Sequence, residues 1–140
     1  MTGEFRIVVG GTDPLPATAV RSAASAVLCG EGMDADLSVT FLGPARMRQL
    51  NREHLGHDHP TDVISFALPH PDGTLAGDIY VCRHVAARQA RDAAEPVRRE
   101  LLRLVIHGTL HVLGWEHPED DNRVDSPMWQ LQERYLRELG

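Results

Sequence analysis

The chain has 140 residues, of which 42% are hydrophobic and 24% are charged. This usage is typical of a soluble globular protein, and the length suffices for one domain with a sizeable core rather than two. We therefore expect a single domain over residues 1–140. The formal charge of −6 argues against nonspecific nucleic-acid binding through a broad basic surface, although it leaves room for a local site.

The sequence shows neither the pattern of a membrane-spanning segment nor that of a signal peptide. No apolar run approaches the roughly 20 residues that span a bilayer, and the N-terminal MTGEFRIVVGG lacks a basic region followed by a long apolar one. We therefore expect a cytoplasmic protein without a membrane partner. Cys29 and Cys82 show no metal or redox spacing and are predicted to be reduced and buried.

Apolar periodicity in the first half predicts two strands and two helices. The strands alternate apolar and polar residues, whereas the helices carry apolar residues at helical spacing and are bounded by Pro and Gly. In chain order we expect a strand over 5–9, a helix from Asp13-Pro14 to Gly30, a strand over 37–42 and a helix from Gly43-Pro44 to about Gly56.

The second half predicts two strands followed by three helices. DVISF and DIYVC, at 62–66 and 78–82, are joined by a loop rich in Pro and Gly and are expected to form an antiparallel pair. Helices follow over 84–94, over 96–113 and from Ser126-Pro127, where Ser126 is a candidate N-cap. The order predicts an α+β fold: a small mixed sheet of about four strands packed with about five helices.

HGTLHVLGWEH, at 107–117, has the spacing of a metal site. His107 and His111 lie four residues apart on a helix that is apolar around most of its circumference, so both side chains leave the same face. Gly114 is suited to end the helix and to turn His117 back toward them. Three neutral imidazoles suit a zinc ion with an open fourth position, at a cleft beside this central buried helix. The alternative is that the histidines only pack in the core.

The same histidine spacing in one class of zinc peptidases carries a glutamate at the second position, where this chain has Gly108. That glutamate takes a proton from the water that attacks the peptide carbonyl, so its absence argues against a peptidase. Phosphodiester cleavage needs an activated oxygen, in-line geometry and cations, which a metal with nearby arginines supplies.

Three blocks of the sequence resemble the YbeY family of bacterial endoribonucleases, the ribosomal RNA maturation factors. HGTLHVLGWEH resembles the family signature H-G-x-L-H-L-x-G-Y-D-H, and LNREHLGHDHPTDVISF at Leu50 to Phe66 resembles L-N-R-E-Y-R-G-K-D-K-P-T-D-V-L-S-F. GDIYVC at Gly77 to Cys82 resembles the strand G-D-I-x-I. The blocks have the family's order and spacing, so the resemblance covers most of the chain.

The resemblance implies a metal-dependent endoribonuclease specific for single-stranded RNA. It would act in the maturation of the 3' end of small-subunit ribosomal RNA and in ribosome quality control, with ribosomal RNA and small-subunit components as partners and no DNA. One zinc ion, or nickel or another divalent metal, would be held by His107, His111 and His117. Four residues would form the wall of the cleft: Thr61, Asp62, Ser65 and Phe66.

The chain departs from the family pattern on the cationic side of the cleft. Leu55 stands where the family has an arginine, and His57 and His59 stand where it has lysines. We expect Arg52, His57 and His59 to contact RNA, with Arg52 partly replacing the missing arginine. The expected reacting group is a metal-bound water, with Arg52 and Asp62 as candidate catalytic residues. Trp115 and Glu116 replace the signature's tyrosine and aspartate, and Glu116 is either a residue that orients a metal ligand or an exposed acid of the loop.

Two other functions remain open at this stage. The first is a zinc peptidase, for which the histidine spacing and the downstream Met128 speak and against which Gly108 speaks. The second is a noncatalytic ribosome assembly factor with a structural metal, which Leu55 makes harder to dismiss.

Overall fold

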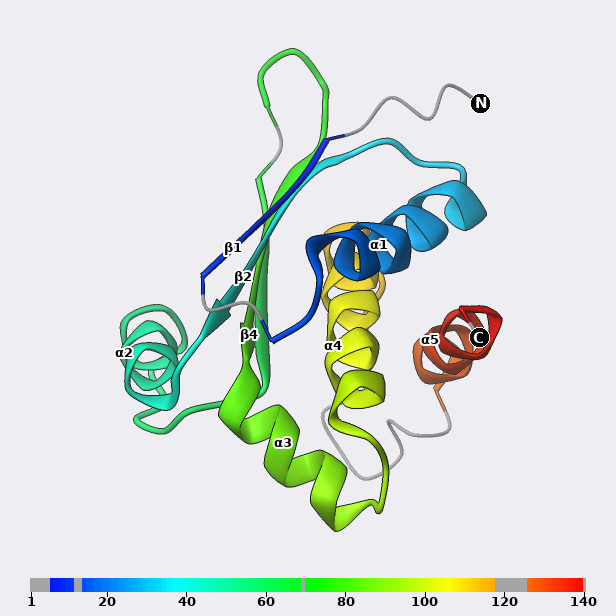
Figure 1. Cartoon of the computed structure of the whole chain (residues 1–140). Helices are drawn as coiled ribbons and strands as arrows, with labels where there is room; N and C mark the ends of the chain where they lie inside the picture. The colour runs from blue at the N-terminus through cyan, green and yellow to red at the C-terminus, as the bar shows by residue number, and fades with distance from the viewer. Residues whose placement is uncertain (1–5, 12–13, 69, 118–125, 140) are drawn as a thin grey trace.

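A computed structural model describes residues 6–11, 14–68, 70–117 and 126–139 (Figure 1). Within these residues the strands and helices follow the predicted order. Their bounds are β1 Ile7–Gly11, α1 Ala17–Glu31, β2 Asp36–Leu42, α2 Pro44–Leu55, β3 Val63–Ala67, β4 Ala76–Cys82, α3 Arg83–Asp92, α4 Val97–Val112 and α5 Pro127–Glu138. The predicted α+β class is confirmed, with four strands and five helices in the described part of the chain.

The four strands form one mixed sheet in the order β1-β2-β4-β3. β1, β2 and β4 run parallel to one another, whereas β3 runs antiparallel to β4. The predicted antiparallel pairing of β3 with β4 is thus confirmed, with Ser65 opposite Ile79. β3 is an edge strand, so one of its long sides is not covered by another strand of the described sheet.

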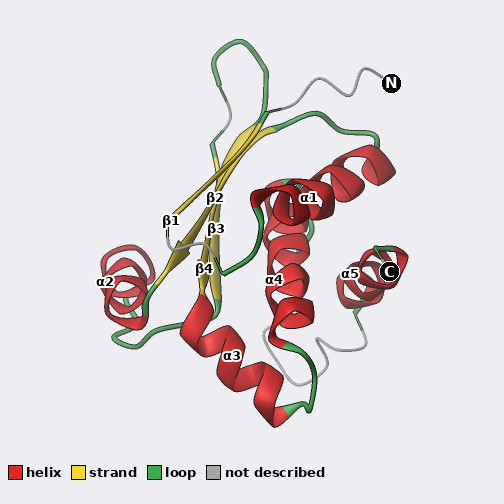
Figure 2. Cartoon of the chain, in the orientation of Figure 1, coloured by secondary structure: helices red, strands yellow, loops and turns green. Residues whose placement is uncertain are grey.

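Helices cover the two faces of the sheet unequally. Figure 2 shows α1 and α4 on one face with α5 beyond them, and α2 against the other face near one end of the strands. The larger core lies between the sheet and α1, α4 and α5, and includes Phe41, Ile79 and Ile106. A smaller apolar cluster around Met47 and Ile64 lies under α2. α4 therefore lies in the middle of the fold and contacts sheet and helices alike.

Local signals set several element ends. Ser126 caps α5 as predicted, since its Oγ accepts a hydrogen bond from the backbone N–H of Trp129 at 3.2 Å. β1 begins at Ile7 rather than at residue 5, which lies outside the described residues.

The prediction that both cysteines are buried is wrong for Cys29, which is exposed on α1. No helix among the described residues is long and apolar enough to cross a membrane.

Candidate metal centre

One face of α4 is polar although most of the helix is buried. Glu100, Arg103, His107 and His111 follow one another at spacings of three, four and four, which places them along one stripe. All four line a cavity of about 1150 Å³. The rest of the lining comes from the end of α2 and the segment that leads into β3, from α3 and the turn after it, from α4 itself and the residues after it, and from α5 with its cap. These residues are Leu55, His57, His59, Thr61, Asp62, Val63, Ile64, Ser65, Gln89, Ala93, Glu95, Leu104, His117, Ser126, Met128, Trp129 and Gln132.

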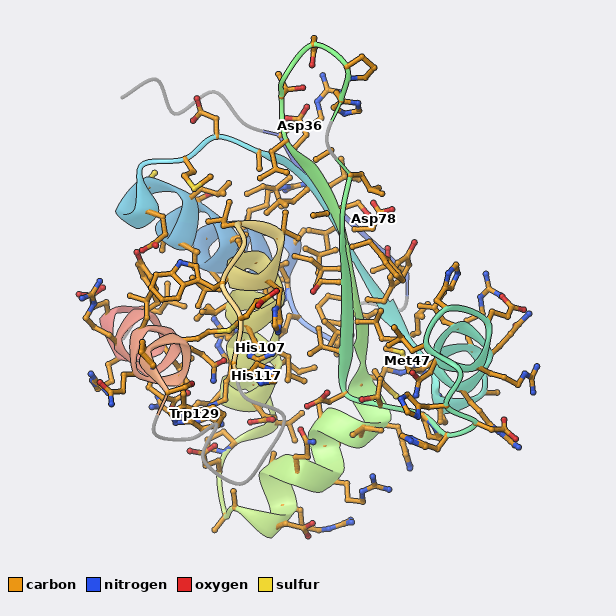
Figure 3. All side chains as sticks on the ribbon, turned by 180° about the vertical axis from the view of Figure 1, so that it is seen from behind. Asp36, Met47, Asp78, His107, His117 and Trp129 are labelled. Carbon is orange, nitrogen blue, oxygen red and sulfur yellow. The ribbon has the colours of Figure 1, made fainter. Side chains whose placement is uncertain are left out.

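The three predicted histidines meet in this cavity. One nitrogen of each of His107, His111 and His117 lies within 4.8 Å of the others. The ring centroids are 4.6 Å apart for His107 and His111, and 5.1 Å apart for each of the other two pairs. Figure 3 shows His107 and His117 together beside α4, on the side where α5 begins near Trp129.

Gly114 provides the turn that brings His117 back, as predicted. Its φ is +100°, a conformation that glycine adopts without steric cost. The backbone N–H of Trp115 donates to the carbonyl of Leu110 at 3.0 Å, so the chain folds back over the last turn of α4.

Two of the three rings are held by carbonyl oxygens. Nδ1 of His107 lies 2.6 Å from Oε1 of Gln132, and Nδ1 of His111 lies 2.9 Å from the backbone oxygen of Trp115. Because a carbonyl oxygen can only accept, each Nδ1 carries the proton and each Nε2 keeps a lone pair. This is the usual support of a metal-binding histidine.

His107 and His111 are held in the neutral form that metals bind. Burial lowers the pKa of His107 to about 4, and the neighbouring His111 and His117 act in the same direction. Burial also lowers the pKa of His111, again helped by His117. Neutral imidazoles with converging lone pairs fit a zinc-like divalent cation, so these residues suit the metal that the sequence motif predicts.

Gly108 faces away from the cavity. A Cβ on this residue would lie 2.6 Å from Cγ2 of Ile79, so the helix packs against β4 where any side chain would stand. The position that carries the glutamate of the zinc peptidases is therefore filled by the sheet in this chain.

Asp62 lines the same cavity as the histidines. Its Oδ1 accepts from the backbone N–H of Val63 at 2.8 Å, and its Oδ2 accepts from Nε2 of Gln89 at 3.3 Å. Its negative charge also raises the pKa of His107, although this is a small effect beside that of burial. Asp62 is thus a carboxylate held by two hydrogen bonds within the cavity that the three histidines line.

Phe66 does not form the wall predicted for it. Thr61 and Ser65 line the cavity, but Phe66 packs on the α2 side of the sheet, with ring centroids 5.2 Å from His54 and 6.2 Å from Tyr80. Successive residues of a strand point to opposite faces, so Ser65 and Phe66 cannot both face the cavity.

The predicted RNA-binding residues are only partly brought together. His57 and His59 line the cavity, with ring centroids 5.8 Å apart. Leu55 lines it too and is 52% exposed. Arg52 is outside the lining, and its NH1 lies 3.5 Å from Oδ1 of Asp58, a carboxylate that also binds another arginine of α2.

An arginine cluster beside the site was not predicted. Arg103 donates to Glu95, Glu100 and Glu133, and we call these four residues the Arg103 cluster. The hydrogen bonds that Arg103 donates to Glu95, together with those it donates to Glu133 and Glu100, raise the pKa of its guanidinium despite burial. Burial would raise the pKa of Glu133, but hydrogen bonds from Arg103 and Gln132 hold it below its usual value. For Glu100 burial prevails and its pKa is raised.

Gln132 is the second residue that the sequence interpretation missed. It is 1% exposed and occupies the apolar stripe of α5, between Met128 and Tyr135. A polar residue at such a core position signals a specific hydrogen bond, because a buried unpaired amide is costly. That signal was present in the sequence.

Comparison with known proteins gives one consistent result. A family model described as Endoribonuclease YbeY matches residues 15–140. The Endoribonuclease YbeY of Xanthomonas campestris pv. campestris (strain B100) is 36% identical over 151 aligned positions, which cover 99% of this chain and 92% of that protein. The one of Stenotrophomonas maltophilia (strain K279a) is 34% identical with the same coverage.

A solved structure is similar over nearly the same extent. The solution structure of TM1509 from Thermotoga maritima matches with a TM-score of 0.68 and 29% identity, covering 95% of this chain and 88% of that one. The family model and the relatives thus agree over almost the whole chain. The chain belongs to the YbeY family of endoribonucleases.

Proposed function

We propose that this protein is a divalent-metal-dependent endoribonuclease that cuts single-stranded RNA. We further propose that it acts on small-subunit ribosomal RNA, at its 3' end, in ribosome maturation and quality control, as the family resemblance implies. The observation that carries the proposal is the convergence of three imidazoles, from α4 and the turn after it, on one cavity that Asp62 also lines. Zinc is the metal that this donor set suits best, with nickel or another divalent ion as alternatives.

A cation bound there would supply an activated water at neutral pH, or would polarise a phosphate oxygen. The protein's own residues hold the rest of the site. His107 and His111 stay neutral through burial, and their Nδ1 protons are bound by carbonyl oxygens. Asp62 is fixed by Val63 and Gln89, so it is the carboxylate placed to accept a proton during attack on phosphorus.

The site has few cations to bind the phosphates of a substrate. Arg103 lines the cavity, but its guanidinium already donates to three carboxylates. Arg52 is engaged with Asp58 outside the lining, and Leu55 cannot form a charge-assisted hydrogen bond. Binding of RNA then falls mainly to the metal, His57 and His59, and we expect it to be weak.

The test combines metal content with cleavage. We expect purified wild-type protein to bind about one divalent ion per chain and to cut single-stranded RNA in preference to a duplex of the same sequence. His107→Ala should lose both metal and cleavage. His84→Ala is the matched control, because His84 is exposed on α3 and is not among the cavity-lining residues. Retention of cleavage by metal-free His107→Ala would refute the proposal.

Two observations bear on the alternatives. The packing of Gly108 against Ile79 leaves no place for the general base of a zinc peptidase, so casein should not be cut. The scarcity of free cations in the cavity favours the noncatalytic assembly factor as the second candidate. If the protein with stoichiometric metal cuts neither RNA nor casein but cosediments with small ribosomal subunits, this second function stands and the first falls.

A further inference from the structure

A chain of hydrogen bonds joins the Arg103 cluster to the metal site. Arg103 donates to both carboxylate oxygens of Glu133, at 2.9 and 3.1 Å. Glu133 Oε2 accepts from Nε2 of Gln132 at 3.0 Å, and Oε1 of Gln132 lies 2.6 Å from Nδ1 of His107. The chain therefore crosses from α4 to α5 and returns to α4.

Each group in this series of hydrogen bonds determines whether the next group donates or accepts. The ionised carboxylate of Glu133 has no donor, so Gln132 must turn its NH₂ group toward it. The amide oxygen of Gln132 then faces His107 and can only accept. Nδ1 of His107 must donate, which leaves the lone pair on Nε2.

His107 and His111 differ in the group that accepts the hydrogen bond from Nδ1. His111 donates to the backbone oxygen of Trp115, which cannot exchange an acceptor for a donor. His107 depends on a side-chain amide whose two ends have almost the same shape. A Gln132 amide rotated by half a turn would present a donor to Nδ1 and would favour the opposite tautomer, whose Nε2 carries a proton and cannot bind a metal.

We propose that Gln132 and Glu133 are positioning residues that select the metal-binding tautomer of His107. Glu133 decides the orientation of the Gln132 amide, and Arg103 holds Glu133 in its ionised form and place. Arg103 is well suited to this, because its side chain is only 12% exposed and its guanidinium reaches both oxygens of Glu133. The inference rests on the metal site of the proposed function but concerns residues that touch no metal.

The chain offers a matched pair of variants. Glu133→Gln and Glu95→Gln each remove one carboxylate that accepts two hydrogen bonds from Arg103, but only Glu133 contacts Gln132. We expect Glu133→Gln to weaken binding of Zn²⁺ by about 10-fold or more, within the range for partners of metal-ligating histidines. Glu95→Gln should bind Zn²⁺ as the wild type does. The measurement is competition with a chromophoric chelator at pH 7.

A second readout does not depend on metal. Long-range ¹H–¹⁵N spectra of the imidazoles distinguish a protonated from an unprotonated ring nitrogen. In the metal-free wild type and in Glu95→Gln we expect His107 to be protonated at Nδ1 alone. In Glu133→Gln we expect a mixture of tautomers at His107, with His111 unchanged.

Exchanging the side chains of Gln132 and Glu133 tests whether the donor and acceptor directions of the hydrogen bonds matter, or only the packing of the two side chains. In the double variant Gln132→Glu/Glu133→Gln, a carboxylate faces Nδ1 of His107 and the new amide can donate to it while its oxygen accepts from Arg103. The double variant should therefore regain the single tautomer and most of the Zn²⁺ affinity that Glu133→Gln loses. A purely structural role would make it worse than either single change.

The outcomes distinguish this inference from the proposed function. If Glu133→Gln matches Glu95→Gln in both tautomer and affinity, or if the double variant is not rescued, the positioning role is wrong. If the wild type binds no Zn²⁺, the proposed function fails, whereas the tautomer of His107 in the metal-free single and double variants still decides the positioning role.

Discussion

Restoring an arginine at Leu55 should strengthen RNA binding. Leu55 ends α2, lines the cavity beside His57 and is 52% exposed, so an arginine there has room to reach a phosphate. Arg48 and Arg52 already engage Asp58, the neighbouring carboxylate, which leaves the new side chain available for the substrate. The end of a helix also favours a positive charge.

The magnitude follows from the exposure of this position. A hydrogen bond to a charged group contributes about 1.5–3 kcal/mol, and solvent screening at a half-exposed site reduces this to about 1 kcal/mol. Leu55→Arg should therefore tighten binding of single-stranded RNA roughly five-fold. One added phosphate contact should also make the slope of log K against log salt steeper by about 0.7.

The assay is fluorescence anisotropy of a labelled single-stranded RNA over a salt series, with chelator present so that the RNA is not cut. Leu68→Arg is the control, because Leu68 is a similarly exposed leucine, at 46%, that does not line the cavity. Both variants add one positive charge to the chain. Equal changes in affinity and salt slope for the two would show that only net charge matters and would refute the assignment of Leu55 to the phosphate-binding wall.

Three further predictions concern stability. Gly108→Ala should destabilise the protein by about 1–3 kcal/mol in urea unfolding, because its Cβ meets Ile79, and a stabilising effect typical of alanine in helices would contradict that packing. Arg103→Met should cost about 3–5 kcal/mol at pH 7, because three carboxylates lose their shared cation. Its deficit in unfolding temperature relative to the wild type should shrink on acidification to pH 5, and a deficit that grows would count against repulsion among the three carboxylates. In metal-free protein, His107 stays neutral while an unfolded histidine takes up a proton below pH 6.5, so stability is lost as pH falls from about 6.5 toward 4. The loss from pH 7 to pH 5 should be about 2 kcal/mol from His107, and His107→Asn should remove that part of the slope in urea unfolding.

Features set by neighbouring residues were predictable from the sequence. The four-residue spacing of His107 and His111 fixes their common face on any α-helix, and Gly114 is the residue that the turn at φ +100° requires. Ser126 as a helix cap belongs to the same class. The strand order was beyond local reasoning, because the insertion of β4 between β2 and β3 depends on pairing between segments far apart in the chain.

Two errors had a remedy in the sequence itself. Ser65 and Phe66 were assigned to one wall from the family resemblance, although strand alternation alone separates them. Gln132 interrupts the apolar stripe of α5 and could have been marked as a buried hydrogen-bonding residue. Its partner His107 is 25 residues away, however, so only the packing of α5 on α4 identifies it. The contact of Arg103 with Glu133 is non-local for the same reason.

The two halves of the site differ in how complete they are. The metal half has three converging imidazoles, two Nδ1 protons bound by carbonyl oxygens and a glycine that lets α4 pack on the sheet. The wall expected to bind phosphate includes Leu55, and the partners of Arg52 and Arg103 are already within the protein. Contacts to remote phosphates stabilise the bound substrate and the transition state equally. Their weakness should therefore raise KM and leave kcat unchanged. Leu55→Arg should then lower KM for RNA cleavage with kcat unchanged, and a rise in kcat would place this position at the reacting phosphate instead.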